Sequence, residues 1–167
     1  EFGLQANSAG VGSGAIISSD GIVVTNNHVV TGAALLRVYV PGSDDPVNAK
    51  VLGVSECSDL AVIDLEGDGY TALPFRTEPV TTGLPIFAAG YPASDASTIE
   101  EVDFTLTRGI VSNLTASGET NWASVDSVLE HDARIRGGNS GGPLVDEDGR
   151  IVGFNYAGLD ASDQNYA

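Results

Sequence analysis

Short runs in which apolar and polar residues alternate cover most of this chain, and turn-forming residues separate them. A period of two puts every second side chain on one face of a strand, which is typical of a half-buried sheet. The pattern predicts an all-β protein with one short helical candidate, the turn that carries His28. Strands are expected at Gly14–Ser18, Ile22–Thr25, Leu35–Val40, Val47–Val54, Leu60–Leu65, Leu84–Ala89, Phe104–Leu114 (with a bend at Gly109), Ser127–His131, Leu144–Val145 and Ile151–Asn155.

Composition narrows the classes of function. The 167 residues are 42% apolar, which is enough for one globular core, and 23 acidic against 7 basic residues give a net charge of −16. Phosphate binding needs clustered Lys and Arg, so this charge disfavours nucleic acids and anionic membranes as partners. No apolar run approaches the roughly 20 residues of a membrane helix. Cys57 is the only cysteine, so no intrachain disulfide forms, and we interpret it as a structural thiol.

A glycine-rich segment around Ser140 suggests nucleophilic chemistry. The run Gly138-Asn139-Ser140-Gly141-Gly142-Pro143-Leu144 precedes a predicted strand. Glycines permit a tight turn whose backbone N–H groups converge on one point, where a developing oxyanion could be held. Serine is a weak nucleophile at its free pKa, so this interpretation requires a base and a group that orients the base.

The chain offers both partners upstream of Ser140. His28 follows the apolar run Ile22–Val24, and Asp59 begins another strand-like run. Taken alone, His28 could be a structural histidine and Asp59 an ordinary loop acid. The order His, Asp, Ser along the chain is that of the chymotrypsin-type triad, in which the aspartate fixes the histidine tautomer and the histidine takes the serine proton. His131, the second histidine, is expected to have a structural or surface role or to line a substrate pocket.

Three motifs carry a resemblance to a known family. Thr25-Asn26-Asn27-His28-Val29-Val30, Ser58-Asp59-Leu60-Ala61-Val62 and the Ser140 segment resemble those of trypsin-like serine proteases of the HtrA/Deg group. Gly12-Ser13-Gly14-Ala15-Ile16-Ile17 resembles the first strand of that group, and Ile151–Asn155 the strand after the nucleophile. The resemblance implies a chymotrypsin-like double β-barrel with the active site in the cleft between the barrels.

The resemblance also implies a domain organisation. Residues 1–167 would form a single protease domain, with an N-terminal barrel over about 10–75 and a C-terminal barrel over about 84–167. The Gly- and Pro-containing region Glu66–Gly83 would link them, and Tyr91–Asp103 would be a surface loop. Residues after Ala157 are polar and turn-rich. We therefore expect the C-terminal barrel to lack its last strand, through truncation or because another chain supplies it.

The resemblance assigns further site residues. The backbone N–H groups of Gly138 and Ser140 would form the oxyanion hole, and the substrate pocket would involve Arg134, Arg136, Asn155 and Tyr156. HtrA-like proteases have small or neutral residues where this chain has the two arginines. An arginine pointing into the pocket would favour an acidic side chain before the cut. In the alternative, both arginines point outward and pair with acids such as Glu130 or Asp132.

The expected activity is that of a serine endopeptidase acting on proteins or peptides, without a cofactor or metal. Two histidines without a cysteine cluster or metal-ligand spacing do not indicate a metal site. Family analogy suggests an extracytoplasmic location and a homo-oligomer. The alternative is a catalytically silent module that keeps the protease fold and binds a partner.

Overall fold

The structure, a computed structural model, describes residues 10–43, 45–92, 102–119, 124–158 and 165–167. Its helical elements are the single turn α1 (Asn27–Val30) and the 3-10 helix η1 (Glu56–Ser58). The strands are β1 (Ala15–Ile16), β2 (Ile22–Asn26), β3 (Leu36–Val38), β4 (Val47–Ser55), β5 (Leu60–Leu65), β6 (Pro85–Gly90), β7 (Thr105–Glu119), β8 (Ser124–His131), β9 (Pro143–Val145), β10 (Ile151–Phe154), β11 (Ala157–Gly158) and β12 (Asn165–Tyr166). The all-β prediction is confirmed.

The N-terminal sheet has the strand order β1-β2-β5-β4-β3, and all of its neighbours are antiparallel. Burial along β5 alternates as its sequence predicts, and Ala61, Ile63 and Leu65 face the core. They pack against Val23 and Val30, so the apolar face of the sheet closes over the residues that flank His28. This packing anchors α1, a helix too short to be stable alone.

The C-terminal sheet has the order β10-β9-β6-β7-β8-β12-β11. Its core contains the fully buried Ile86, Val111 and Leu144. The expected bend of β7 at Gly109 is not where the register changes, because Gly109 pairs regularly with Ile86. The first register shift in the pairing with β8 lies between Val111 and Asn113. The shift marks a bulge, which increases the local twist of a strand, and the expected bend at Gly109 stays a prediction.

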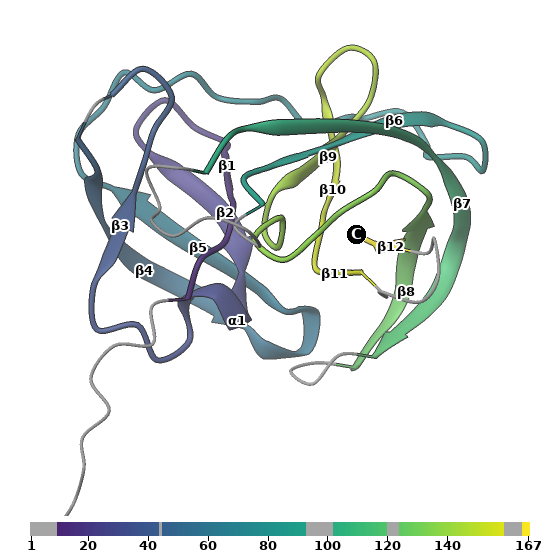
Figure 1. Cartoon of the computed structure of the whole chain (residues 1–167), viewed down its shortest axis with the longest axis horizontal. Coiled ribbons are helices and arrows are strands. Elements are labelled where there is room, and N and C mark those ends of the chain that lie inside the picture. The colour runs from purple at the N-terminus through teal and green to yellow at the C-terminus, as the bar shows by residue number, and fades with distance from the viewer. Residues whose placement is uncertain (1–9, 44, 93–101, 120–123, 159–164) are drawn as a thin grey trace, which may run out of the picture.

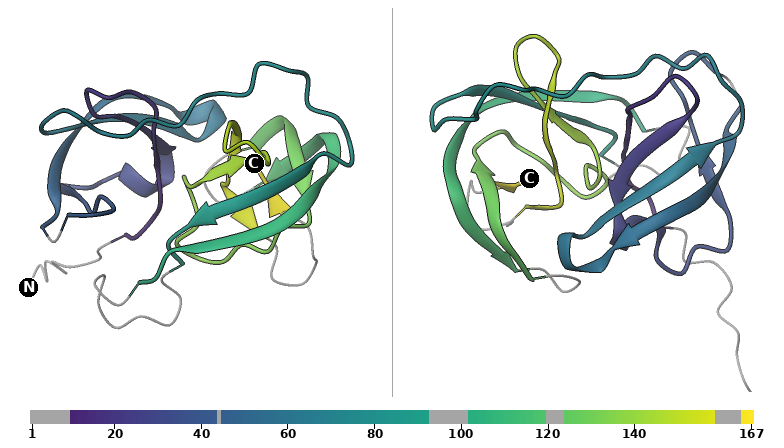
Figure 2. Two further views of the ribbon diagram at one scale, coloured as in Figure 1. Left: turned by 90° about the horizontal axis from the view of Figure 1, so that it is seen from above. Right: turned by 180° about the vertical axis from the view of Figure 1, so that it is seen from behind.

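Figure 1 shows the two sheets as separate curled halves, the N-terminal one in purple and blue and the C-terminal one in green and yellow. The turned views in Figure 2 keep the halves apart, so the separation does not depend on the viewing direction. α1 lies on the side of the N-terminal half that faces the C-terminal half. No helix of the described residues has the length and apolar character needed to cross a bilayer.

Two short strands follow β10. β11 pairs with β12, and β12 pairs with β8 through Asn165 and Tyr166. Residues 159–164, which join them, lie outside the described residues, as does most of the expected surface loop at 91–103. The expectation that the C-terminal barrel lacks its last strand therefore stays a prediction.

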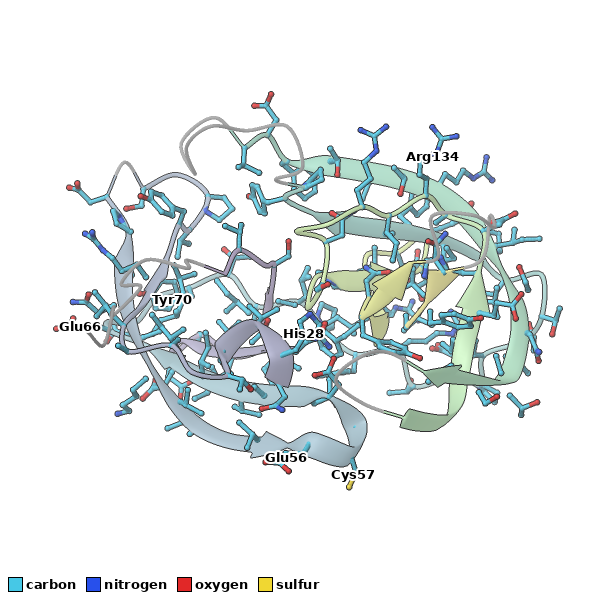
Figure 3. All side chains as sticks on the ribbon, turned by 60° about the horizontal axis from the view of Figure 1, so that its bottom comes forward. His28, Glu56, Cys57, Glu66, Tyr70 and Arg134 are labelled. Carbon is cyan, nitrogen blue, oxygen red and sulfur yellow. The ribbon has the colours of Figure 1, made fainter. Side chains whose placement is uncertain are left out.

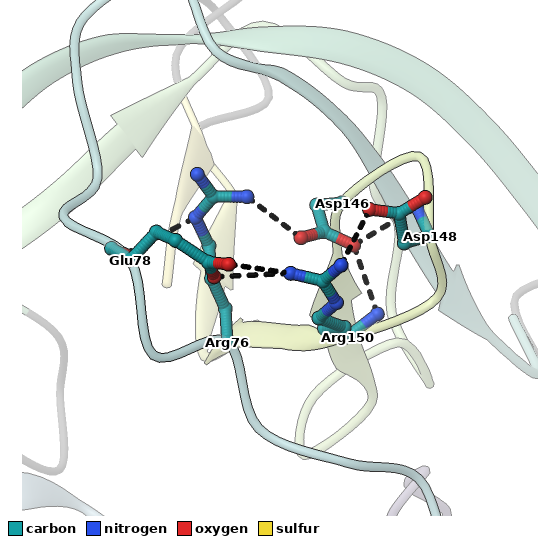
Figure 4. Close-up of polar contacts among 5 residues, drawn as sticks. All are labelled: Arg76, Glu78, Asp146, Asp148 and Arg150. Atoms are coloured by element: carbon teal, nitrogen blue, oxygen red, sulfur yellow. Dashed lines mark hydrogen bonds and ion pairs between the residues drawn. The ribbon is translucent and has the colours of Figure 1, made fainter.

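The segment between the sheets is held against the β9–β10 hairpin by backbone and side-chain contacts. Phe75 forms a parallel bridge with Ile151, and Arg76 N–H donates to the Ile151 carbonyl at 2.9 Å. Arg76 Nη1 lies 2.8 Å from Oδ2 of the buried Asp146 (Figure 4). Arg150 binds Glu78 and Asp148 at the exposed rim of this network. Residues 75–78 of the link are thus fixed to the C-terminal half, whereas Tyr70 and Leu73 donate backbone hydrogen bonds to Ser19 and Ile16 of the N-terminal half.

Asp146 is the buried acceptor at the centre of this network. Burial alone would raise the pKa of its carboxyl, but hydrogen bonds from the Arg150 N–H, the Arg76 guanidinium and the Asp148 N–H outweigh burial and lower the pKa. The two N–H donors both bind Oδ1, at 2.9 and 3.0 Å. Arg76 is the ion-pair partner of Oδ2, so removing it leaves a buried charge without a counter-ion.

We predict that Arg76→Ala lowers the free energy of unfolding by about 3 kcal/mol, because it strands the Asp146 carboxylate. Arg108→Ala is the matched control, since Arg108 and Glu147 are 3.9 Å apart and both largely exposed. An exposed pair of this kind contributes less than about 1 kcal/mol. Urea unfolding of both variants measures the difference, and equal losses would contradict a structural role for the Arg76–Asp146 pair.

Candidate active site

Asp59 holds His28 through both oxygens of its carboxylate. Oδ2 lies 2.6 Å from His28 Nδ1, and Oδ1 accepts the His28 backbone N–H at 2.9 Å. The Asp59 carbonyl accepts Asn27 N–H and Asn26 Nδ2, both at 2.9 Å. Because a carboxylate accepts hydrogen bonds, the contact places the neutral imidazole proton on Nδ1 and leaves Nε2 free to act as a base.

The backbone of Asp59 is unusual. Its φ of 49° and ψ of 38° are left-handed, and it is the one non-glycine residue with positive φ in the described part of the chain. It ends η1 and begins β5, and its side chain is completely buried. Strained backbone at a buried polar residue persists only where the surrounding contacts enforce it, and it is common at functional sites. The four contacts to Asn26, Asn27 and His28 supply that enforcement.

Ser140 comes from the other sheet. It lies on the turn between β8 and β9, which we call the nucleophile turn (residues 137–142). Gly141, with φ of 82°, packs so tightly that an added Cβ would lie 2.2 Å from Thr25 Oγ1 and 3.0 Å from Asn26 N. Only glycine fits there. The nucleophile turn is therefore pressed against the residues that lead directly into His28.

The structure thus brings the three predicted residues to one junction between the halves. Figure 3 shows His28 at the centre of the molecule, between the two sheets. His28 and Asp59 are in direct contact, whereas Ser140 Oγ makes no hydrogen bond within the described ranges. Catalytic hydrogen bonds are often long before substrate binds, so this geometry is compatible with a catalytic role for Ser140.

The proposed oxyanion donors lie on the same turn. Gly138 has φ of 98°, and Asn139 N–H closes the turn onto the Arg136 carbonyl at 3.0 Å. Among the described residues, neither the Gly138 nor the Ser140 N–H has a protein acceptor. An oxyanion hole requires N–H donors that no protein acceptor occupies, and these two groups meet that condition.

Asn155 holds the nucleophile turn through three hydrogen bonds. Its carbonyl accepts Gly141 N–H at 2.7 Å, its N–H donates to the Gly142 carbonyl at 2.9 Å, and its side-chain Nδ2 reaches the same carbonyl at 3.0 Å. The neighbouring Tyr156 is also buried, and burial, Tyr166 and Asp59 raise the pKa of its hydroxyl to about 12. Of the two residues expected in the substrate pocket, Asn155 thus binds the turn that carries Ser140, and Tyr156 lies within electrostatic reach of Asp59.

The two arginines expected in the pocket are exposed. Figure 3 shows Arg134 at the outer edge of the C-terminal half. Neither Arg134 nor Arg136 forms an ion pair with a described residue, although the sequence offered Glu130 and Asp132 as partners. Their backbone carbonyls, by contrast, accept hydrogen bonds from Thr107 Oγ1 and Asn139 N–H.

Cys57 is exposed at the tip of the N-terminal half, in the turn before Asp59.

His131 is fully buried beside this machinery. Burial lowers its pKa from 6.5 to about 4, against smaller opposing effects of the Asn155 side chain, the Asp132 charge and the Ala133 backbone. Neither ring nitrogen has a hydrogen-bond partner among the described residues. His131 is therefore neutral at pH 7, and protonating it requires charging a group enclosed in the C-terminal core.

We predict that His131 makes the fold sensitive to acid. Because its folded pKa is depressed, its contribution to stability is complete above the unfolded pKa of 6.5 and is lost as the pH falls toward 4. The difference in unfolding free energy between the wild type and His131→Gln should fall by about 3 kcal/mol over this range. Urea unfolding of both proteins at pH 7, 5.5 and 4 measures it. A constant difference would show that His131 titrates normally.

Comparison with known proteins identifies the family. Residues 12–154 match the model of the trypsin-like peptidase domain. The chain is 35% identical over 167 residues to the serine protease Do-like HtrA of Bacillus subtilis, covering 93% of this chain and 35% of that protein. It is 37% identical over 151 residues to the serine protease HTRA1 of Xenopus laevis, covering 88% of this chain and 31% of that protein. The chain thus spans about a third of the length of these curated relatives.

Solved structures agree. The HtrA-type protease AlgW with a decapeptide superposes with a TM-score of 0.81 at 30% identity, over 94% of this chain and 47% of that one. The Rv3671c protease in its inactive form superposes with a TM-score of 0.76 at 29% identity, over 93% and 76%. The predicted chymotrypsin-like double β-barrel and the HtrA/Deg-like resemblance are confirmed. Because the family model covers residues 12–154, this chain belongs to the trypsin-like peptidase domain family.

Proposed function

We propose that this chain is a serine endopeptidase that hydrolyses peptide bonds through a Ser140 acyl-enzyme. The observation that carries the proposal is the double contact of the buried Asp59 carboxylate with His28, at 2.6 and 2.9 Å. An aspartate that only stabilised the fold would not need to bind the imidazole Nδ1, the contact that leaves Nε2 as the basic nitrogen. Family membership supports the same reaction class.

Each residue has a distinct step. His28 Nε2 takes the proton from Ser140 Oγ as the oxygen attacks the substrate carbonyl carbon. The Gly138 and Ser140 N–H groups stabilise the negative oxygen of the tetrahedral intermediate. His28 then protonates the leaving amine, and water attacks the acyl-enzyme in the same way to release the acid and regenerate Ser140. Asp59 keeps the imidazole tautomer and stabilises the imidazolium. No step needs a cofactor.

The substrates are proposed to be proteins or peptides. This follows from relatives that are named as serine proteases and from an HtrA-type structure with a bound decapeptide. One relative, from Marinomonas, is named as a probable periplasmic endoprotease, and we propose an extracytoplasmic location here too. A homo-oligomer is proposed by family analogy alone. The high negative charge supports neutral or cationic substrate segments.

The pocket for the residue before the cut is proposed to involve Arg134, Arg136, Asn155 and Tyr156. Arg136 is closer to Ser140 in sequence than Arg134 is, and we propose it as the arginine that reaches a bound substrate. A guanidinium there favours cleavage after Glu or Asp. Profiling a peptide library with the wild type and Arg136→Ala tests this preference, with Arg134→Ala as the control. Cleavage only after small aliphatic residues in all three proteins would contradict the proposed preference for Glu or Asp.

We predict that Ser140→Ala and His28→Ala each lower kcat/KM by about four to six orders of magnitude, and that the double variant loses little more, because the two residues act as one unit. Asp59→Asn should cost about 10⁴-fold through the wrong imidazole tautomer. Casein cleavage and labelling by a fluorophosphonate probe measure these effects, with Cys57→Ala as the control. A folded wild-type chain that neither cleaves nor reacts would instead be a binding module that keeps the protease fold.

A further inference from the structure

Ser13 connects the two halves of the site through every polar group it has. It lies just before β1, and it is buried, with 8% of its surface exposed. Its N–H donates to the Ser140 carbonyl at 2.8 Å, and its Oγ donates to the Gly138 carbonyl at 2.7 Å. Oγ also accepts Tyr91 N–H at 2.9 Å, and the Ser13 carbonyl accepts Thr25 Oγ1 at 2.7 Å. Four hydrogen bonds from one small residue are more than packing requires.

Two of these bonds act on the proposed oxyanion donors. Ser13 anchors the carbonyls of Gly138 and Ser140, the two residues whose N–H groups would face the oxyanion. A carbonyl held in one direction fixes ψ of its residue and so restricts how the whole peptide turn can rotate. The restriction matters because Gly137 and Gly138 would otherwise give this turn access to many conformations. Ser13 therefore holds the carbonyl side of the turn toward the N-terminal half.

The other contacts reach the histidine. Thr25 lies on β2, which runs directly into α1 and His28. The same Ser13 carbonyl that accepts Thr25 Oγ1 would lie 2.3 Å from a Cβ placed on Gly141. Ser13 is thus packed between the strand that carries the base and the turn that carries the nucleophile, with no space for either to shift toward the other.

We propose that Ser13 is a positioning residue for the reaction, whose hydroxyl orients the nucleophile turn so that the Gly138 and Ser140 N–H groups point at the substrate carbonyl oxygen. The inference rests on the proposed function. It assigns a role to a segment that the sequence marked only as the beginning of the first strand. Ser13 does not touch the reacting atoms, and it acts through Gly138.

Ser13→Ala is the informative variant, because it removes the hydroxyl and keeps the backbone bond to Ser140. The substrate is a chromogenic peptide matched to the casein cleavage sites. On it, kcat should fall about 10- to 100-fold, a smaller decrease than removal of an oxyanion donor itself causes. KM should stay within about twofold, since ground-state binding does not use these N–H groups. Inhibition by a peptide boronic acid, which forms a tetrahedral adduct, should weaken by a similar factor to kcat.

Two further variants complete the experiment. Ser43→Ala is the matched control, because Ser43 is exposed and its hydroxyl donates, among the described residues, to the Asp45 carbonyl of its own turn. Ser13→Cys, nearly isosteric with serine but a weak donor, serves if Ser13→Ala does not fold, and the same split between kcat and KM is expected of it. Thermal unfolding of each variant ensures that rates are compared on folded protein.

The outcomes separate cleanly. A fall in kcat and in boronate affinity at constant KM supports the proposal. A Ser13 variant with lower thermal stability but kcat within twofold of wild type, or with the loss confined to KM, overturns it, while hydrolysis by the wild type leaves the proposed function standing. A wild type no more active than Ser140→Ala overturns the proposed function, and this inference with it.

Discussion

The architecture of the site depends on the two hydrogen bonds between the Asp59 carboxylate and His28. A fully buried carboxylate is tolerable only with partners, and here both oxygens bind N–H groups of one residue. Those bonds require the left-handed backbone at the end of η1, which Asn26 and Asn27 stabilise by binding the Asp59 carbonyl. The N-terminal sheet therefore positions the His28 imidazole, with its tautomer fixed, at the boundary between the halves.

The nucleophile turn of the C-terminal half must lie close to the residues that hold His28. Glycine at position 141 lets the nucleophile turn touch Thr25 and Asn26, and Asn155 holds the turn from the opposite side. Ser13 crosses between the halves, and the Arg76–Asp146 pair fixes the segment that joins them. These contacts lie far apart in sequence. Together they explain how residues from two separate sheets keep a geometry that is sensitive to shifts of an ångström.

Local patterns predicted much of this from the sequence. Alternation located the strands, as in β5. The order of His28, Asp59 and Ser140 pointed to a triad; the structure pairs His28 with Asp59, and the catalytic roles of the three residues stay predictions. The bulge beyond Val111 and the pairing of β12 with β8 escaped prediction, because register and short edge strands depend on tertiary partners rather than on periodicity. The roles of Ser13 and of the Arg76–Asp146 pair were missed for the same reason, and for His131 the sequence left a structural and a pocket-lining role open. Each acquires its role only when residues tens of positions away arrive beside it, although the pair Gly12–Ser13 before a strand could have suggested a close backbone approach.

The most direct test is the structure of the chain after reaction with a peptidyl phosphonate, which mimics the tetrahedral intermediate. The account predicts phosphorus bonded to Ser140 Oγ, and one phosphonyl oxygen about 2.7–3.1 Å from both the Gly138 and Ser140 nitrogens. His28 Nε2 should face Ser140 Oγ while Nδ1 stays on Asp59. Modification of another residue, or a phosphonyl oxygen that meets neither N–H group, would contradict a site assembled from the two halves.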